Sequence, residues 1–428
     1  MDSNNVIEKI KNGEYDELFI DIYVDKNRLE YQKKRYIDAV TSFVKNYGAE
    51  EIEIYSAPGR SEIGGNHTDH QHGEVLAAAI NLDAIAVVQK REDNTVRIMS
   101  DGYDEIVLCL DDEQLNMVDE EKGTTKSLIK GIIFKMKQNG HKTGGFNAYI
   151  TSDVLVGAGL SSSAAYETLI GTIMSGLYND MSVSPVEIAM TGQYAENVYF
   201  GKPCGLMDQM ACSVGNLVHI DFKEPEKPVI KEVYLDLDKY GFSLCITDTK
   251  GSHADLTDDY AAIPKEMKEI AHFFDKDVLC EVSKEDILNN ISKLREKAGD
   301  RAVLRAIHFI NENERVRAEV SAINDGDIEE FLNLVKKSGD SSYKYLQNVY
   351  TNKNIKNQKI SLALAVSEMI LGDNGVSRVH GGGFAGTIQA FVKNESVEVY
   401  KIYMNNVFGD GACVCLKIRK YGGIKFCL

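Results

Sequence analysis

Residues 153–165 read DVLVGAGLSSSAA, a glycine-rich turn that leads into a run typical of a helix over 166–178. The backbone N–H groups that begin a helix lack partners within it, and the helix dipole favours an anion such as phosphate beside them. Glycines let a ligand approach the backbone closely, and the serine hydroxyls can cap the helix or bind a metal ion that accompanies phosphates. The stretch therefore predicts a phosphate-binding turn. A turn that only caps its helix is the alternative that these residues leave open.

Two common nucleotide-binding patterns are absent from this stretch. It contains no G-x-x-x-x-G-K-[ST] sequence, so the lysine of a P-loop is missing. It also lacks G-x-G-x-x-G followed about 20 residues later by an acidic residue on a second strand. A nucleotide bound here must be held by another architecture.

The composition indicates a globular chain with a substantial core. Its 428 residues are 43% hydrophobic, which is enough for two domains. The net charge of −17 argues against a nucleic acid or an anionic membrane as partner. The eight cysteines form no C-x-x-C pair, so we expect a reducing, cytoplasmic compartment. The N-terminus lacks the apolar core of a signal peptide, and no run approaches the roughly 18 apolar residues of a membrane span.

A polar segment follows a predicted strand over 51–56. Residues 57–73 read APGRSEIGGNHTDHQHG, and the Pro-Gly and Gly-Gly pairs predict a tight, exposed loop. Its Asp and His side chains suit a polyhydroxylated ligand, because they accept from and donate to vicinal hydroxyls. Two alternatives remain open, a solvated loop without a ligand and a zinc site formed by the three histidines between 67 and 72 together with the aspartate among them.

Two carboxylates in the segment 195–215, AENVYFGKPCGLMDQMACSVG, are candidates for chemistry. Asp208 follows a Gly-Leu-Met turn and has apolar neighbours, so we expect it to be buried at the start of a helix. A carboxylate in that position is either an N-cap or a catalytic base. Glu196, on the preceding helix, is expected to form a surface ion pair or to reach a divalent ion.

The rest of the chain predicts a mixture of strands and helices. Apolar and alternating runs predict strands at 75–89, 95–99, 106–110, 148–151, 217–222, 242–248 and 411–419. Helical periodicity predicts helices at 28–47, 127–139, 185–199 and 397–406, and a mainly helical region at 261–371 with a capping box at 283–286. Two strand-like runs within 375–392 flank three consecutive glycines, which let the backbone pass a ligand or a neighbouring loop closely.

Taken together, these segments resemble the GHMP small-molecule kinases, and among them the galactokinases. The motif APGR…HTD at 57–69 resembles the galactokinase sugar-binding signature, VGAGLSSSAA at 156–165 the family's phosphate loop, and SRVHGGGFAG at 377–386 its third glycine-rich motif. Further similar segments are CGLMDQ at 204–209, TDTKGSHADLTDDY at 247–260 and HFINENERV at 308–316. The six motifs occur in the family's order and span nearly the whole chain.

The resemblance implies an ATP- and Mg²⁺-dependent sugar kinase that phosphorylates the anomeric hydroxyl. Asp208 matches the family's catalytic base and Arg60 the arginine that faces it, and such a cation keeps the carboxylate ionised. The positions that match sugar contacts are Asn66, His67, Asp69, Gly205 and Tyr260. The positions that match the phosphate loop are Gly157, Ala158, Gly159, Leu160, Ser161, Ser162 and Ser163. Glu196, with Ser162 or Ser163, matches the magnesium ligands.

The chain departs from the family within the sugar signature. Galactokinases typically read Glu-His-Thr-Asp-Tyr, whereas this chain has Asn66 in place of the glutamate and His70 in place of the tyrosine. The glutamate accepts a hydrogen bond from the C6 hydroxyl of the sugar, but an asparagine also donates and carries no charge. We therefore expect residue 66 to contact the C6 group of the sugar. A kinase for galacturonate or N-acetylgalactosamine is an alternative to a galactose kinase.

The fold implied by the resemblance is a two-domain α+β GHMP kinase fold. A mixed-sheet domain over 1–225 would carry the sugar signature and the phosphate loop, and a ferredoxin-like domain over 226–428, with helical insertions, would carry the third motif. We expect a monomer that binds a sugar and ATP. Two rival functions remain. A sensor that binds sugar and ATP without catalysis would be expected to depart at Asp208 or the phosphate loop, and a metal-dependent hydrolase would use the histidines of the 67–72 segment.

Overall fold

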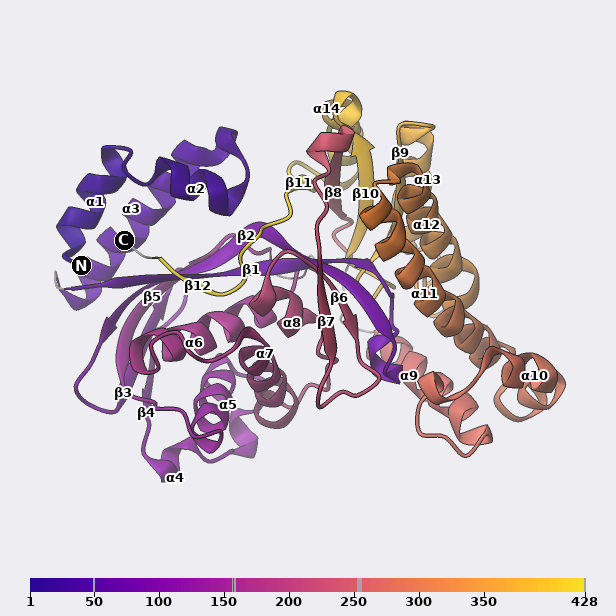
Figure 1. Cartoon of the computed structure of the whole chain (residues 1–428), viewed down its shortest axis with the longest axis horizontal. Helices are drawn as coiled ribbons and strands as arrows, with labels where there is room; N and C mark the ends of the chain where they lie inside the picture. Colours follow the sequence, from indigo (N-terminus) through magenta and orange to yellow (C-terminus); the bar gives the residue numbers. More distant parts are fainter. Residues whose placement is uncertain (49–50, 156, 158, 252–255, 427–428) are drawn as a thin grey trace.

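The computed structural model describes residues 1–48, 51–155, 157, 159–251 and 256–426, and within them the strands form two sheets (Figure 1). The first sheet has eight strands in the order β12-β1-β2-β5-β3-β4, with β6 paired to β2 and β7 paired to β6. Its β3 and β5 are parallel and its other pairs antiparallel, so the predicted mixed sheet is confirmed. The second sheet has four antiparallel strands in the order β11-β8-β10-β9.

The elements have the following bounds. The strands are β1 (Glu53–Gly64), β2 (Glu74–Lys90), β3 (Thr95–Ser100), β4 (Ile106–Cys109), β5 (Phe146–Ser152), β6 (Leu217–Asp221), β7 (Val229–Val233), β8 (Phe242–Asp248), β9 (Gly375–His380), β10 (Thr387–Lys393), β11 (Cys413–Leu416) and β12 (Ile424–Lys425). The helices are α1 (Ser3–Lys11), α2 (Asp16–Tyr23), α3 (Leu29–Tyr47), α4 (Asp112–Leu115), α5 (Thr125–Gln138), α6 (Ser162–Tyr178), α7 (Pro185–Tyr194), α8 (Met207–Val214), α9 (Thr257–Phe273), α10 (Lys284–Ala298), α11 (Asp300–Asp325), α12 (Ile328–Ser341), α13 (Lys359–Leu371) and α14 (Val397–Phe408). The π-helical segments η4 (Ala195–Phe200) and η7 (Ser342–Leu346) continue α7 and α12.

Strand β2 lies at the centre of the first sheet and is buried over nearly its whole length. Its run of apolar residues fits a strand covered on both faces. Ala84, Ala86 and Val88 pack with α5 and α6, whereas Ile85 and Val87 pack with α1, α2 and α3. Figure 1 shows these two groups of helices on opposite sides of the sheet. The two layers cover both faces of β1 and β2, and β1 carries Arg60 of the site described below.

Strand β1 is longer than the sequence predicts. The segment APGRSEIG, predicted as an exposed loop, continues the strand to Gly64 and is buried. The pairing of β1 with β2 shifts register between Pro58 and Arg60 and again between Glu62 and Gly64. Such irregularities admit proline and glycine into a strand without ending it. The loop prediction was wrong for this part, and the connection to β2 begins only after Gly64.

The second sheet is also covered on both faces. Leu244 and Ile246 of β8 pack with α11 and α12, whereas Cys245, between them, packs with α13 and α14. This alternation follows from the two-residue period of a strand. The predicted capping box is confirmed at the start of α10, where Ser283 and Asp286 bond reciprocally. The glycine-rich turn between β9 and β10 faces the first sheet, since His380 of β9 contacts Ser61 of β1.

The last residues return to the first sheet, where β12 pairs with β1 (Figure 1). On the way, the N–H group of Arg419 donates to the carbonyl oxygen of Ala79 in β2. Among the residues that the structure describes, none of the helices combines the length and the apolar character needed to span a membrane.

Candidate active site

The predicted phosphate loop lies between β5 and α6, against β1. Gly157 and Gly159 adopt left-handed backbone conformations with φ of 77° and 66°, which glycine adopts without strain. A Cβ atom at Gly59 of β1 would lie 2.7 Å from the carbonyl oxygen of Leu160, so glycine is needed there for the close approach. Ala158 lies outside the described residues. The loop therefore meets β1 backbone to backbone.

Helix α6 begins at Ser162, and its N-terminus faces this loop. The hydroxyl of Ser161 does not cap the helix but donates to Oδ2 of Asp208. The capping alternative therefore does not describe this serine. Since an uncapped helix start attracts anions, the arrangement suits a phosphate group.

Arg60 of β1 and Asp208 of α8 form an ion pair beside the loop. Nε and Nη2 of Arg60 donate to Oδ1 of Asp208 over 2.8 and 2.7 Å, and Nη1 donates to the carbonyl oxygen of Gly159. Burial raises the pKa of Asp208, but Arg60 and the Ser161 hydroxyl outweigh this effect, so the pKa lies below its ordinary value. The N-cap of α8 is Leu206, so Asp208 is not a cap. Its side chain keeps 34% of its exposure, which makes it an ionised and accessible proton acceptor.

Ser163 and Glu196 lie together at the start of α6. Oγ of Ser163 is 3.5 Å from Oε1 of Glu196, and Nζ of Lys202 is 3.0 Å from the same oxygen. The predicted ion pair of Glu196 is therefore present, with Lys202 as its partner. Hydroxyl and carboxylate oxygens are also hard ligands of the kind that Mg²⁺ prefers. These groups fit a divalent ion. The contact favours Ser163 over Ser162, which has no bond to Glu196 among the described residues.

The side chain of Asn66 is fully buried and bonded to the protein. Its Nδ2 donates to Oε1 of Glu62 over 2.9 Å and to the carbonyl oxygen of Gly381 over 2.8 Å. Its Oδ1 accepts from Nδ2 of Asn348 over 2.8 Å and from the hydroxyl of Ser342 over 3.2 Å. An amide has two N–H groups and two acceptor positions. All four are used here within the protein.

Among the other predicted sugar contacts, His67 and Asp69 lie in the connection between β1 and β2, and Gly205 lies against Asp69. His67 donates from Nε2 to the carbonyl oxygen of Gly382 over 3.0 Å. Burial and the neighbouring His70 lower the pKa of His67 to about 4, so its ring is neutral at pH 7. A Cβ atom at Gly205 would lie 1.8 Å from Oδ2 of Asp69, so glycine leaves room for that carboxylate.

Tyr260, at the start of α9, completes this side of the site. Its hydroxyl donates to the carbonyl oxygen of Gly383 over 2.6 Å, and its ring packs edge-on against Phe384, with centroids 5.3 Å apart. The third glycine-rich motif therefore contacts two of the residues predicted to bind the sugar, His67 and Tyr260.

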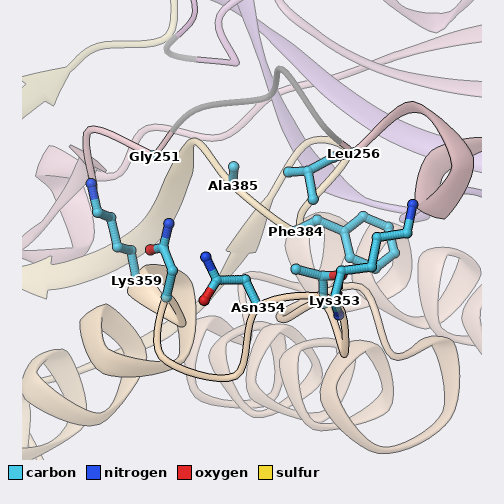
Figure 2. Close-up of a pocket in the computed structure, with 9 residues that line it drawn as sticks. Gly251, Leu256, Lys353, Asn354, Lys359, Phe384 and Ala385 are labelled. Atoms are coloured by element: carbon cyan, nitrogen blue, oxygen red, sulfur yellow. Dashed lines mark hydrogen bonds between the residues drawn. The ribbon is translucent and has the colours of Figure 1, made fainter.

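Phe384 also lines a cavity of about 130 Å³. Figure 2 shows Lys353 and Lys359 at its two sides and Ala385 beside Phe384. None of the residues predicted for the site lines it. Of the predicted set, Arg60 and Ser161 contact Asp208, whereas Tyr260 contacts Phe384, which lines this cavity.

The zinc alternative gains no support from the geometry. Within the described residues, no three His, Cys, Asp or Glu side chains are grouped closely enough to hold a metal ion. The ring of His67 is bonded to a backbone carbonyl oxygen instead.

Several residues of the site were not identified from the sequence. His308 and Glu312 of α11 hold the backbone that follows β1. Nε2 of His308 donates to the carbonyl oxygen of Asn66 over 2.9 Å, and Oε1 of Glu312 accepts from N–H of Gly65 over 3.2 Å. Both lie in the segment HFINENERV, whose resemblance to the family was the available signal. Gln209, directly after Asp208, donates to Glu196 and Glu167.

Known proteins resemble this chain over most of its length. The GHMP kinases N-terminal domain matches residues 127–216, and the galactokinase galactose-binding signature matches residues 41–90. A galactokinase of Glaesserella parasuis is 30% identical over 362 residues, which cover 84% of this chain and 90% of the relative. A galactokinase of Streptomyces coelicolor is 29% identical over 374 residues, covering 86% and 91%.

Solved structures agree on the fold. The Lactococcus lactis galactokinase complexed with galactose superposes with a TM-score of 0.77 at 24% identity, covering 90% of this chain and 98% of that one. A mevalonate kinase superposes with a TM-score of 0.56 at 16% identity, covering 86% and 99%. The fold and the arrangement of the glycine-rich loops define a GHMP kinase, as the sequence predicts. Within that class, the chain belongs to the galactokinase family.

Proposed function

We propose that this chain transfers the γ-phosphoryl group of ATP to the C1 hydroxyl of galactose. The observation that carries the proposal is the placement of Asp208, which is ionised, partly exposed and bonded to Arg60 and Ser161. It lies between the phosphate loop and the residues that match sugar contacts. The galactokinase relatives and the galactose complex of the Lactococcus lactis enzyme support the choice of galactose.

In this mechanism, Asp208 accepts the proton of the C1 hydroxyl as that oxygen attacks the γ-phosphorus. Arg60 keeps Asp208 ionised and offsets the charge that develops on the transferring group. The N–H groups that begin α6 bind the phosphate oxygens. Gly205 leaves room for Asp69 to accept from sugar hydroxyls, and His67 and Tyr260 lie along the same side.

Ser163 and Glu196 are the residues that would hold the Mg²⁺ ion of the nucleotide. When bound, Mg²⁺ neutralises charge on the β- and γ-phosphates. Ser162 remains a second candidate from the sequence, and the contact between Ser163 and Glu196 favours Ser163.

The alternative substrate galacturonate depended on residue 66 facing the C6 group. The Asn66 amide is bonded on every side to the protein, so this residue offers nothing to a C6 carboxylate. The sensor alternative predicts the loss of catalytic groups, but Asp208, Arg60 and Glu196 are all present. Both observations favour a galactose kinase.

The monomeric state and the cytoplasmic location are further parts of the proposal. So is a division into two domains at 225/226, with β7 and β12 of the second part pairing into the first sheet. The seven cysteines that the structure describes form no disulfide, which suits a reducing compartment.

The test is ATP consumption with Mg²⁺ over galactose, N-acetylgalactosamine, galacturonate, glucuronate, glucose and arabinose. We expect galactose to give the highest kcat/KM, and a ³¹P spectrum of the product to identify a sugar 1-phosphate. A preference for galacturonate would replace the proposed substrate. Galactose binding without ATP turnover would restore the sensor.

A further inference from the structure

Three buried side chains form a connected group beside the proposed metal site. Nε2 of Gln209 donates to Oε2 of Glu196 over 2.8 Å and to Oε2 of Glu167 over 3.0 Å. Glu167, Glu196 and Gln209 are 1%, 4% and 0% exposed. An amide nitrogen carries two hydrogens, so Gln209 can direct one to each carboxyl group, and the same nitrogen also lies 3.7 Å from Sγ of Cys204.

This arrangement has no evident value for the fold alone. The burial of two carboxyl groups next to each other is costly, and burial and the neighbouring Glu196 raise the pKa of Glu167 well above its ordinary value. The local sequence nevertheless makes space for them. Gly192, inside α7, lacks the Cβ atom that would lie 3.0 Å from Oε2 of Glu167, although glycine within a helix costs about 1 kcal/mol relative to alanine. A function in the site would explain why the group is present.

The group fixes the orientation of Glu196. Gln209 holds Oε2, so Oε1 is the oxygen turned towards Ser163 and Lys202. Glu196 lies in η4, a π-helical segment, and such segments occur frequently at functional sites. Glu167 lies one turn after Ser163 on α6, so the same helix supplies both the hydroxyl and the anchor of the amide.

We propose that Glu167 and Gln209 are positioning residues that orient Glu196 towards the divalent ion of the bound nucleotide. The inference rests on the proposed function, since it assigns roles around the same metal site. Glu167 acts by accepting a hydrogen bond from Gln209, and Gln209 acts by donating one to Glu196. Partners that orient a metal ligand typically change metal affinity 10- to 100-fold when they are replaced.

The experiment compares Glu167→Met, Glu167→Gln and Gln209→Met with the unmodified chain. Glu167→Met and Gln209→Met remove the acceptor and the donors at similar size. Glu167→Gln keeps an oxygen that accepts from Gln209 but cannot ionise. Tyr166→Phe is the matched control, because it removes a buried hydroxyl next to Glu167 that has no hydrogen-bond partner among the described residues.

Two quantities are measured for each variant. The first is the affinity for ADP by calorimetry, with Mg²⁺ and with EDTA, and the second is the Mg²⁺ concentration that gives half-maximal activity. We expect Glu167→Met and Gln209→Met to weaken the Mg²⁺-dependent part of ADP binding about 10- to 100-fold and to raise the half-maximal Mg²⁺ concentration to match. In these two variants, ADP binding in EDTA and the KM for the sugar should change little. The thermal unfolding of the control, Tyr166→Phe, should also change little.

Glu167→Gln tests whether the hydrogen bond to Gln209 is sufficient. If its Mg²⁺-dependent ADP affinity falls by much less than about 10-fold, the hydrogen bond to Gln209 is what matters. If that affinity falls as far as in Glu167→Met, the hydrogen bond is not sufficient and positioning is overturned. Equal Mg²⁺ dependence in all variants also overturns it. Failure of the proposed function would look different: the unmodified chain would show no sugar-dependent ATP turnover, while Mg²⁺-dependent ADP binding could still be measured.

Discussion

Nδ2 of Asn66 lies 2.9 Å from Oε1 of Glu62 and donates to it, in a part of the protein closed to solvent. Nη2 of Arg378 donates to the same oxygen over 2.5 Å. The glutamate that galactokinases carry at position 66 is absent, but a carboxylate is present four residues earlier on β1. Asn66 therefore joins the connection between β1 and β2 to the turn after β9 and to the segment after α12.

Asn66→Glu should destabilise the fold. The new carboxylate would lie beside Glu62 without water to screen the repulsion, and we expect a loss on the order of 3–5 kcal/mol in the free energy of unfolding, measured by urea denaturation. The control is Asn289→Glu, on the exposed face of α10, for which we expect little change in the free energy of unfolding. Adding Glu62→Gln should recover much of the loss, because one carboxylate is then left. A stable Asn66→Glu variant with altered sugar preference would instead favour the sequence-based hypothesis that residue 66 reads C6.

Asp208→Asn should abolish phosphoryl transfer and leave sugar binding nearly intact. The amide cannot accept the C1 proton, and general bases typically contribute about 10²- to 10⁴-fold to the rate. The measurements are kcat and the galactose affinity by calorimetry. Unchanged turnover would remove Asp208 from the role of base.

Arg60→Met should move the acid limb of the pH–rate profile upward. In the unmodified chain the pKa of Asp208 is held below its ordinary value of about 3.9, so its protonation should not limit kcat/KM near neutral pH. Without Arg60, the burial of the carboxyl group is no longer outweighed, and its pKa rises. The rate should therefore fall with decreasing pH at a higher pH than before. An acid limb at the same pH in both forms would mean that Arg60 does not keep Asp208 ionised.

Gly205→Ala should impair sugar binding selectively. The new Cβ atom would lie 1.8 Å from Oδ2 of Asp69, and the aspartate side chain is able to swing away while the backbone stays. We expect a higher KM for the sugar with an unchanged KM for ATP and unchanged thermal unfolding. A variant with the parental sugar KM would exclude Asp69 from sugar binding.

The sequence predicted the elements whose signals are local. Strand β2 and helix α3 have strong hydrophobic patterns, and the predictions at 75–89 and 28–47 agree with the structure within two residues. Strand β7 was missed because its exposed residues show no apolar pattern. Strand β1 was cut short because Pro58 and Gly59 usually end regular structure, whereas register shifts absorb them here.

The site was predictable where one residue type performs one role. Asp208 and Arg60 contact each other as the family resemblance implies. The orientation of Asn66 was not predictable, because its partners Ser342, Asn348 and Gly381 lie far away in the sequence. A substitution within a motif shows that a group has changed, but only the surrounding contacts show which way the new side chain faces.

The stability of the layer formed by α1, α2 and α3 on the first sheet should depend most on Asp83. It is fully buried and accepts from Nη1 of Arg35 over 2.6 Å, from Nη1 of Arg419 over 2.9 Å and from the hydroxyl of Tyr23 over 2.8 Å. It thus ties α2, α3 and the C-terminal segment to β2. Asp83→Asn leaves the buried guanidinium group of Arg419 without a carboxylate partner among the described residues and leaves Arg35 with Asp153, 3.5 Å away. We expect a loss of about 3–5 kcal/mol in the free energy of unfolding.

The pH dependence of that loss separates charge from packing. Burial raises the pKa of Asp83, but Arg35 and Arg419 outweigh it and hold the pKa below its ordinary value. The native state therefore binds fewer protons than the unfolded chain, and the stabilisation is complete above about pH 3.9 and is lost as the pH falls through the native pKa. The difference between the unmodified chain and Asp83→Asn should shrink below pH 4. Asp93→Asn, which breaks an exposed ion pair with Arg91, should change stability little at any pH. A difference for Asp83→Asn that stays constant down to pH 2 would mean that the contacts, and not the charge, stabilise the fold.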